Sequence, residues 1–163
     1  RAIDCGYRGV STKCCKGPLK SVLNRGLIWK LNEEREGQFL MSAEDLCCVG
    51  MVPLQADLCL VAALGIDHVE RNGHHYHPGL SYLSANEQSS ILEAHPDLYG
   101  RVGNTVAPRI VDGQFSIGSL QCEGMGFAIA PDVQQMIPVD KWEFESMWEA
   151  ANDERRTPEF DGR

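Results

Sequence analysis

Lysine and carboxylate side chains gather where three short β-like runs of the sequence end. Lys13 closes the first run, Glu44 follows the second, and Glu70 lies in the third. Burial favours the neutral form of a lysine, which can then accept a proton from a substrate. These three residues are therefore candidate catalytic groups. An ion pair that only holds the strand ends together explains the same residue types equally well.

Further polar residues adjoin these three and are assigned to substrate binding: Lys16, Ser42, Asp45, Asn72, His74 and His75. The histidines are expected to hold a substrate or the backbone through their ring N–H groups. A zinc site is the less favoured interpretation, because adjacent histidines in an extended chain point to opposite sides. We therefore expect no metal ligand in this set, and we expect the isolated His68 and His95 to be structural.

The elements that position these residues follow from the apolar pattern. Extended runs are predicted over 7–13, 38–43 and 67–72, separated by helices over 19–36 and 54–64. In the first helix, the apolar residues recur at helical spacing: Leu19, Val22, Leu23, Leu27 and Leu31. Alternating strands and helices with short links predict right-handed parallel βαβ units.

Period-two alternation sorts the strand side chains onto two faces. If apolar side chains face the covering helices, the polar positions share the opposite face: Lys13, Ser42, Glu44, Glu70 and Asn72. Asp45 falls on the other parity. Because active sites of α/β folds lie at the carboxyl ends of the strands, we expect the site on this polar face.

The pattern changes after residue 80. A helix is predicted over 84–94, where Ser84 and Glu87 have the spacing of a capping box. A hairpin is predicted over 109–117 around the turn dipeptide Asp112–Gly113, and an acidic helix over 141–154. We therefore divide the chain into strand–helix units (1–80), a following helix, hairpin and glycine-rich segment (81–138), and an acidic helix with a tail (139–163).

Composition excludes two classes of partner. A formal net charge of -8 with dispersed basic residues argues against nucleic acid. No apolar run approaches the roughly 20 residues that span a bilayer. The seven cysteines are odd in number and include two adjacent pairs, which favours free thiols in a reducing compartment and predicts a cytoplasmic location.

The predicted parallel sheet is too small to be stable alone. Parallel sheets are normally covered on both faces and either extended or closed, and only two helices separate the three predicted strands. We therefore expect further strands before Arg1 in a longer parent protein. For the same reason the isolated chain is expected to aggregate or to form oligomers.

Four segments of the chain resemble the later part of one enzyme superfamily. They are 6–20 (GYRGVSTKCCKGPLK), 39–45 (FLMSAED), 69–75 (VERNGHH) and 110–127 (IVDGQFSIGSLQCEGMGF). Together they resemble the enolase superfamily, in its mandelate racemase and muconate lactonizing enzyme-like branch. The resemblance implies an α/β fold: strands six to eight of a (β/α)8 TIM-type barrel, followed by a helix, a hairpin and a segment that packs on the capping domain.

The resemblance also implies a chemistry. Enzymes of this superfamily are lyases and isomerases that abstract a proton α to a carboxylate, with Mg²⁺ stabilising the enolate. It assigns Lys13 as the base on the sixth strand, Glu44 or Ser42 to the seventh, and Glu70 to the eighth. The seventh strand lacks the His common in the racemase-like branch. The metal ligands would lie upstream of this chain, in the amino-terminal part of the same protein, so the chain alone is expected to be inactive.

Two alternatives remain open from the residues. The parent could be a degenerate barrel that only binds a small acidic ligand, which the missing seventh-strand His suggests. The chain could instead be a complete small α/β domain with a histidine-rich binding loop. A symmetric homo-oligomer is compatible with all three interpretations.

Overall fold

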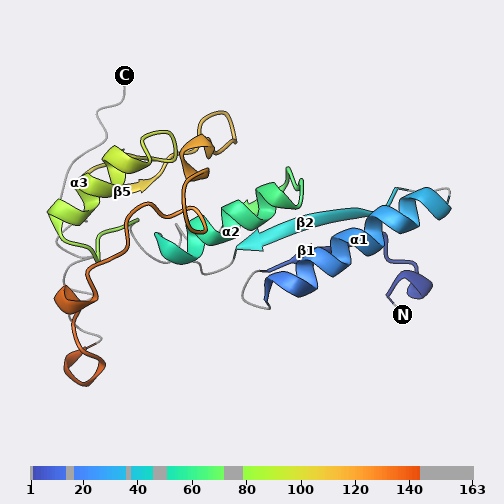
Figure 1. Cartoon of the computed structure of the whole chain (residues 1–163), viewed down its shortest axis with the longest axis horizontal. Helices are drawn as coiled ribbons and strands as arrows, with labels where there is room; N and C mark the ends of the chain where they lie inside the picture. The colour runs from blue at the N-terminus through green and yellow to red at the C-terminus, as the bar shows by residue number, and fades with distance from the viewer. Residues whose placement is uncertain (1, 14–16, 36–37, 46–50, 72–78, 144–163) are drawn as a thin grey trace, which may run out of the picture.

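The computed structural model describes residues 2–13, 17–35, 38–45, 51–71 and 79–143. Its elements in chain order are η1 (Ile3–Cys5), β1 (Gly9–Thr12), α1 (Pro18–Glu34), β2 (Leu40–Asp45), α2 (Val52–Ala63), β3 (Val69–Arg71), α3 (Ala85–Ala94), β4 (Tyr99–Val102), β5 (Thr105–Pro108), η4 (Gly118–Leu120), η5 (Val133–Gln135) and η6 (Val139–Lys141). The fold is mixed α/β, and the described elements are strung along one long axis (Figure 1).

A parallel sheet of three strands, in the order β1-β2-β3, forms the first part of the molecule. β1 and β3 each pair with β2 in the parallel direction, with Thr12 opposite Ala43 and Glu44 opposite Glu70. The predicted strands and their parallel βαβ connections are therefore confirmed. Within the described ranges the strands form an open layer and do not close into a barrel.

α1 begins at Pro18, where proline suits the first turn of a helix because its missing N–H is not needed there. Ile28 and Leu31 are buried against the sheet, and the hydroxyls of Ser21 and Thr12 hydrogen-bond to each other beneath the helix. Near the end of the helix, the Asn32 amide donates to the Phe39 carbonyl at 3.0 Å and accepts from the Phe39 N–H at 2.7 Å. These contacts fix α1 on one face of the sheet.

The apolar periodicity of α1 does not mark the buried face of the helix. Of the five apolar residues that define it, only Leu31 is buried, whereas Leu19, Val22, Leu23 and Leu27 are all more than half exposed. The helix was predicted correctly, but most of its large apolar side chains are more than half exposed in the described part of the protein.

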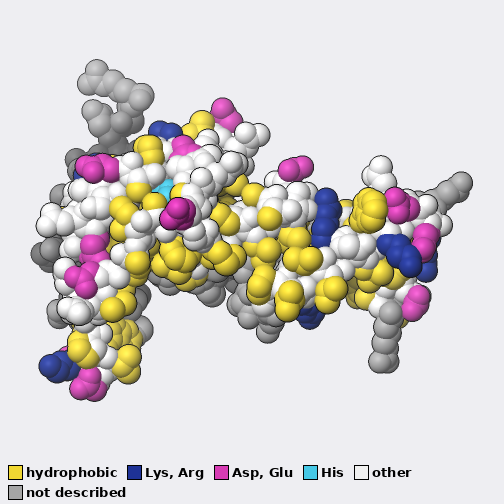
Figure 2. Space-filling model, in the orientation of Figure 1, with side chains coloured by type: hydrophobic (Ala, Val, Ile, Leu, Met, Phe, Trp, Pro, Cys, Tyr) yellow, Lys and Arg dark blue, Asp and Glu magenta, His cyan; other side chains and the backbone are white. Residues whose placement is uncertain are grey.

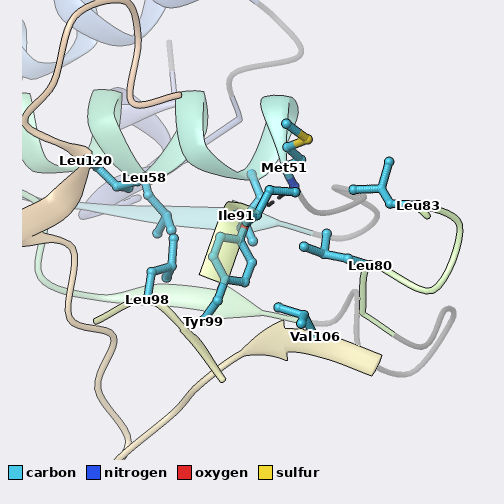
Figure 3. Packing of buried hydrophobic residues seen from close by; sticks show 10 residues of the cluster. Met51, Leu58, Leu80, Leu83, Ile91, Leu98, Tyr99, Val106 and Leu120 are labelled. Atoms are coloured by element: carbon cyan, nitrogen blue, oxygen red, sulfur yellow. Dashed lines mark hydrogen bonds between the residues drawn. The ribbon is translucent and has the colours of Figure 1, made fainter. Parts of the chain in front are cut away.

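α2 belongs to two hydrophobic cores. Leu54 and Leu58 of the helix, with Met51 just before it, pack into a core with residues from 80–120 (Figure 3). Its second half packs Leu60 and Val61 against α1 and β2. The helix therefore joins the parallel sheet to the C-terminal half of the chain.

α3 begins with the predicted capping box, which is confirmed. The Glu87 N–H donates to the Ser84 hydroxyl at 3.3 Å, and the Ser84 N–H donates to the Glu87 carboxylate at 3.0 Å. These reciprocal bonds satisfy backbone donors that the first turn of a helix leaves open.

A hairpin that the sequence did not predict lies at residues 99–108. Strands β4 and β5 pair antiparallel around the two-residue loop Gly103–Asn104, and Gly103 has a φ of 57°, as a primed hairpin turn requires. The predicted turn at Asp112–Gly113 is also formed: Val111 and Gln114 exchange both backbone hydrogen bonds, at 3.0 and 2.9 Å, and Asp112 and Gly113 have φ values of 51° and 75°, as a type I′ turn requires. The described pairing stops at this single bridge, so the hairpin is shorter than the predicted range 109–117. The predicted helix over 141–154 falls almost wholly outside the described residues.

Candidate functional site

The two faces of the parallel sheet differ sharply in character. Thr12 and Ala43 are buried on the face that α1 and α2 cover. Because side chains alternate along a strand, Lys13 and Glu44 lie on the opposite face. None of the described helices covers that face, and Leu40, which shares it, is 59% exposed. This open surface is the polar face that the alternation predicted.

Lys13 and Glu44 are brought together at the carboxyl ends of their strands. The Lys13 Nζ lies 3.1 Å from a Glu44 carboxylate oxygen, and about a quarter of each side chain is exposed. The arrowhead of β2 in Figure 1 points toward the part of the molecule that holds α3 and β5. The pair therefore stands at the sheet edge that faces the C-terminal half.

Glu70 completes a row with this pair. It lies directly opposite Glu44 in the β2–β3 register, and neighbouring strands are about 4.8 Å apart. Its side chain is exposed. One lysine and two carboxylates from three successive strands thus lie side by side on the polar face, as expected.

A second polar row runs one step nearer the amino ends of the strands. Ser42 is half-buried on the polar face and lies opposite Ser11 of β1. On the other side of Ser42 is His68, whose carbonyl accepts a hydrogen bond from the Ala43 N–H at 2.9 Å. His68 is exposed on the polar face, so it does not belong to the core. Ser11 was not assigned to the site, although strand alternation alone could have placed both residues there.

Several predicted binding residues are not tested by the structure. Lys16, Asn72, His74 and His75 lie outside the described residues. The backbone of Asp45 ends β2 opposite Arg71, and the position of its side chain is not described.

Metal ligands do not gather in the described part of the chain. No group of three or more His, Cys, Asp and Glu side chains is arranged there to hold an ion. The row of Lys13, Glu44 and Glu70 contains only two carboxylates, with an ammonium group beside one of them. The described residues therefore do not fit a magnesium site.

A serine, a histidine and an aspartate also meet beyond α3, but not in the order that nucleophilic catalysis requires. The buried His95 has its Nδ1 3.1 Å from the Ser119 hydroxyl, whereas the Asp97 carboxylate accepts from the backbone N–H groups of Ser119 and Leu98 at 3.0 Å each. A catalytic triad needs the carboxylate on the histidine. Burial lowers the pKa of His95, against smaller opposing effects of Asp97 and Ser119. This cluster is a structural anchor for residues 118–120.

Comparisons with known proteins do not add a family to this geometry. No protein-family model, curated protein or solved structure shows a significant match to the chain. The chemistry of the site must therefore be argued from its own side chains.

Proposed function

We propose that this chain is part of an α/β-barrel enzyme that removes a proton α to a carboxylate in a small substrate. The observation that carries the proposal is the Lys13–Glu44 pair, held at 3.1 Å on the open face at the carboxyl ends of parallel strands. This is where α/β folds place their active sites. The enolase-like sequence motifs supply the reaction class, that of a lyase or an isomerase.

In this mechanism Lys13 is the base. Once it has lost its own proton, its amine accepts the α-proton while the C–H electron pair moves into the carboxylate to form an enolate. Glu44 orients the amine, and Glu70 and Ser42 contact the substrate from the neighbouring strands. Magnesium would stabilise the enolate, but its ligands must come from outside the described residues. We place them in an amino-terminal part of the same protein.

Two features of the sheet support the proposed barrel: its strands are parallel, and helices cover only one of its faces. The strands are parallel, both connecting helices lie on one face, and the polar face is open. We propose that β1, β2 and β3 are the sixth, seventh and eighth strands of a TIM-type barrel. The C-terminal half then lies beyond the carboxyl ends of these strands.

The proposed location is the cytoplasm. The described cysteines Cys5, Cys59 and Cys122 are free thiols, as expected in a reducing compartment. Burial, with a smaller effect of Cys122, raises the pKa of Cys59 and keeps it protonated. No helix in the described ranges is long and apolar enough to cross a membrane.

The test follows exchange of the α-proton of small carboxylates with solvent deuterium by NMR, in the longest natural polypeptide that contains this chain. Lys13→Ala should slow exchange by about 100-fold or more, which is the usual contribution of a general base. Lys20→Ala removes an exposed lysine of α1 and is the matched control. Exchange that survives Lys13→Ala would exclude Lys13 as the base.

A second function is favoured by the same ion pair. A lysine paired with a carboxylate is charged, and a charged lysine on an open face attracts an acidic ligand without chemistry. The degenerate barrel would then bind a small carboxylate and release it unchanged. Calorimetry would detect binding that Lys13→Ala abolishes, while the unmodified protein shows no proton exchange.

A further inference from the structure

Two segments that are far apart in the sequence each place a half-buried cysteine on the same side of α2. Cys59 belongs to this helix, and Cys122 lies in the segment that follows η4. Both thiols are free. Neither has a role in the proposed function, whose residues lie on the parallel sheet.

The segment that carries Cys122 is fastened to α2 on both sides of this residue. Before it, the Leu120 carbonyl accepts a hydrogen bond from the Cys59 thiol at 3.6 Å. After it, the Gly126 carbonyl accepts a hydrogen bond from the Gln55 amide at 2.8 Å. Gln55 and Cys59 are four residues apart, so both anchors lie on one side of the helix. Figure 2 shows hydrophobic side chains gathered over the part of the molecule where this segment meets α2.

The backbone near Cys122 also lies close to the Cys59 sulfur. A Cβ added to Gly126 would overlap the Cys59 Sγ, so the segment passes in direct contact with this sulfur. Cys122 is two residues beyond Leu120, and two residues span at most about 7 Å. A disulfide needs Cα atoms roughly 4.4–6.8 Å apart. Cys122 is therefore anchored within reach of the Cys59 thiol.

The two thiols differ in how readily they react. Burial raises the pKa of Cys59, and the charge of Cys122 is a second and smaller cause, as expected for a like charge that lies nearby. A thiol that stays protonated is a poor nucleophile. We therefore expect Cys122 to react first with an oxidant and Cys59 to react second.

We propose that Cys59 and Cys122 form a peroxide-sensitive redox site, in which oxidation joins their two sulfurs in a disulfide. Hydrogen peroxide first oxidises the Cys122 thiol to a sulfenic acid and releases one water molecule. The Cys59 sulfur then attacks the sulfenic sulfur. The S–S bond forms, the S–O bond breaks, and the hydroxyl leaves with the Cys59 proton as a second water molecule. The two thiols lose two electrons in total, and the peroxide gains them.

The disulfide would fix residues 118–126 covalently to α2. This segment already holds Ser119, which bonds to His95 and Asp97 beyond the end of α3. Oxidation would therefore join α2 to that corner of the molecule. In a reducing compartment such a pair is reduced at rest and closes only transiently, as redox sensors do. The redox site does not depend on the chemistry proposed for Lys13, and the two can fail separately.

The experiment treats the 163-residue chain at low concentration with hydrogen peroxide and then blocks the remaining thiols with N-ethylmaleimide in denaturant. Proteolytic cleavage before aspartate isolates each cysteine in its own peptide, 57–66 for Cys59 and 112–131 for Cys122. We expect mass spectrometry to find these two peptides joined, and to lose the joined species after reduction. The same treatment in urea should reduce its yield, because the unfolded chain does not hold the two thiols together.

Cys122→Ser is the matched variant, because it removes one sulfur and changes the size of the side chain little. In this variant the Cys59 peptide should be recovered with its thiol blocked by maleimide after peroxide treatment. In the unmodified chain, oxidation should raise the melting temperature, since a disulfide constrains the unfolded state, and Cys122→Ser should abolish the rise.

Two results would overturn the redox site. In the first, peroxide carries Cys122 on to the sulfinic acid while Cys59 remains a free thiol, which would show that the sulfurs cannot reach each other. In the second, the main products are disulfides between separate chains or with other cysteines, such as the exposed Cys5.

Discussion

The two halves of the molecule differ in how completely their cores are closed. In the core that α2 shares with the C-terminal half, Leu80, Leu98 and Val106 are 0% exposed. The core between α1, α2 and the parallel sheet is slightly more exposed, since its residues, such as Ile28 and Leu31, are 4–9% exposed. We refer to these as the C-terminal core and the sheet core.

The two cores also differ in how the elements around them are covered. The C-terminal core is closed by a helix, a hairpin and loop segments that pack around one centre (Figure 3). The parallel sheet is covered on one face only, and its other face carries Lys13, Glu44 and Glu70. In the proposed function, these strand ends stay open to a substrate and therefore cannot be packed on both faces.

The largest expected effect is in the C-terminal core. Leu80→Ala should lower the free energy of unfolding by about 4 kcal/mol, because it removes a fully enclosed side chain and leaves a cavity. Leu31→Ala makes the same chemical change in the sheet core, which can collapse more easily, and should cost about 2 kcal/mol. Urea unfolding followed by circular dichroism measures both. If Leu31→Ala lowered the free energy of unfolding more than Leu80→Ala, the sheet core and not the C-terminal core would be the more sensitive to a cavity.

Acid should weaken the C-terminal half first. Burial lowers the pKa of His95 from its ordinary value of 6.5, so the unfolded chain binds a proton more readily than the folded chain. Stability should therefore be unaffected well above pH 6.5 and should fall as the pH drops below that value. The buried Nε2 has no hydrogen-bond partner, so a proton placed there would be poorly satisfied.

His95→Gln tests the source of this pH dependence. Glutamine can keep a hydrogen bond to Ser119 but does not titrate, so the slope of stability between pH 6.5 and about 5 should flatten. Thermal melting across this range provides the measurement. If the variant kept the slope of the parent chain, another group would be responsible. Asp97 acts at lower pH: although burial opposes the shift, hydrogen bonds from Ser119 and Leu98 lower its pKa.

The smallest expected effect is at the open face of the sheet. The Lys13–Glu44 pair is partly exposed, and such pairs contribute about 1 kcal/mol or less. Lys13→Met should therefore change the free energy of unfolding very little, as measured by urea unfolding. A loss above about 3 kcal/mol would make this lysine a structural ion-pair partner, since only a buried pair is destabilised so strongly when broken.

Local patterns predicted much of the fold. Alternation and helical spacing gave the strands and helices of the first 71 residues in the correct order, and the spacing of Ser84 and Glu87 gave the cap of α3. These features depend on neighbouring residues. Both turn dipeptides, Gly103–Asn104 and Asp112–Gly113, form turns, but only the second was predicted. The longer ladder lies at the first, where Tyr99 and Val106 are buried, and burial is a tertiary property that the turn sequence does not show.

The candidate site was predicted in part, because strand alternation is also a local pattern. Strand alternation placed Lys13, Glu44 and Glu70 on one face, and the register brings the three into one row. His68 was expected to be structural because it is an isolated histidine, although alternation places it on the same face as Glu70. The exposure of Leu19 and Leu23 also could not be predicted, since helical spacing does not show whether a partner lies beside the helix.

The position of α2 in both cores has a consequence for how the chain opens. Met51 and Leu54 anchor one end of this helix in the C-terminal core, and Leu60 and Val61 anchor the other in the sheet core. Loss of either core alone leaves half of the helix still packed. The amide hydrogens in its middle turns should therefore exchange with solvent more slowly than those of α1 or α3, because they are released only when both halves come apart.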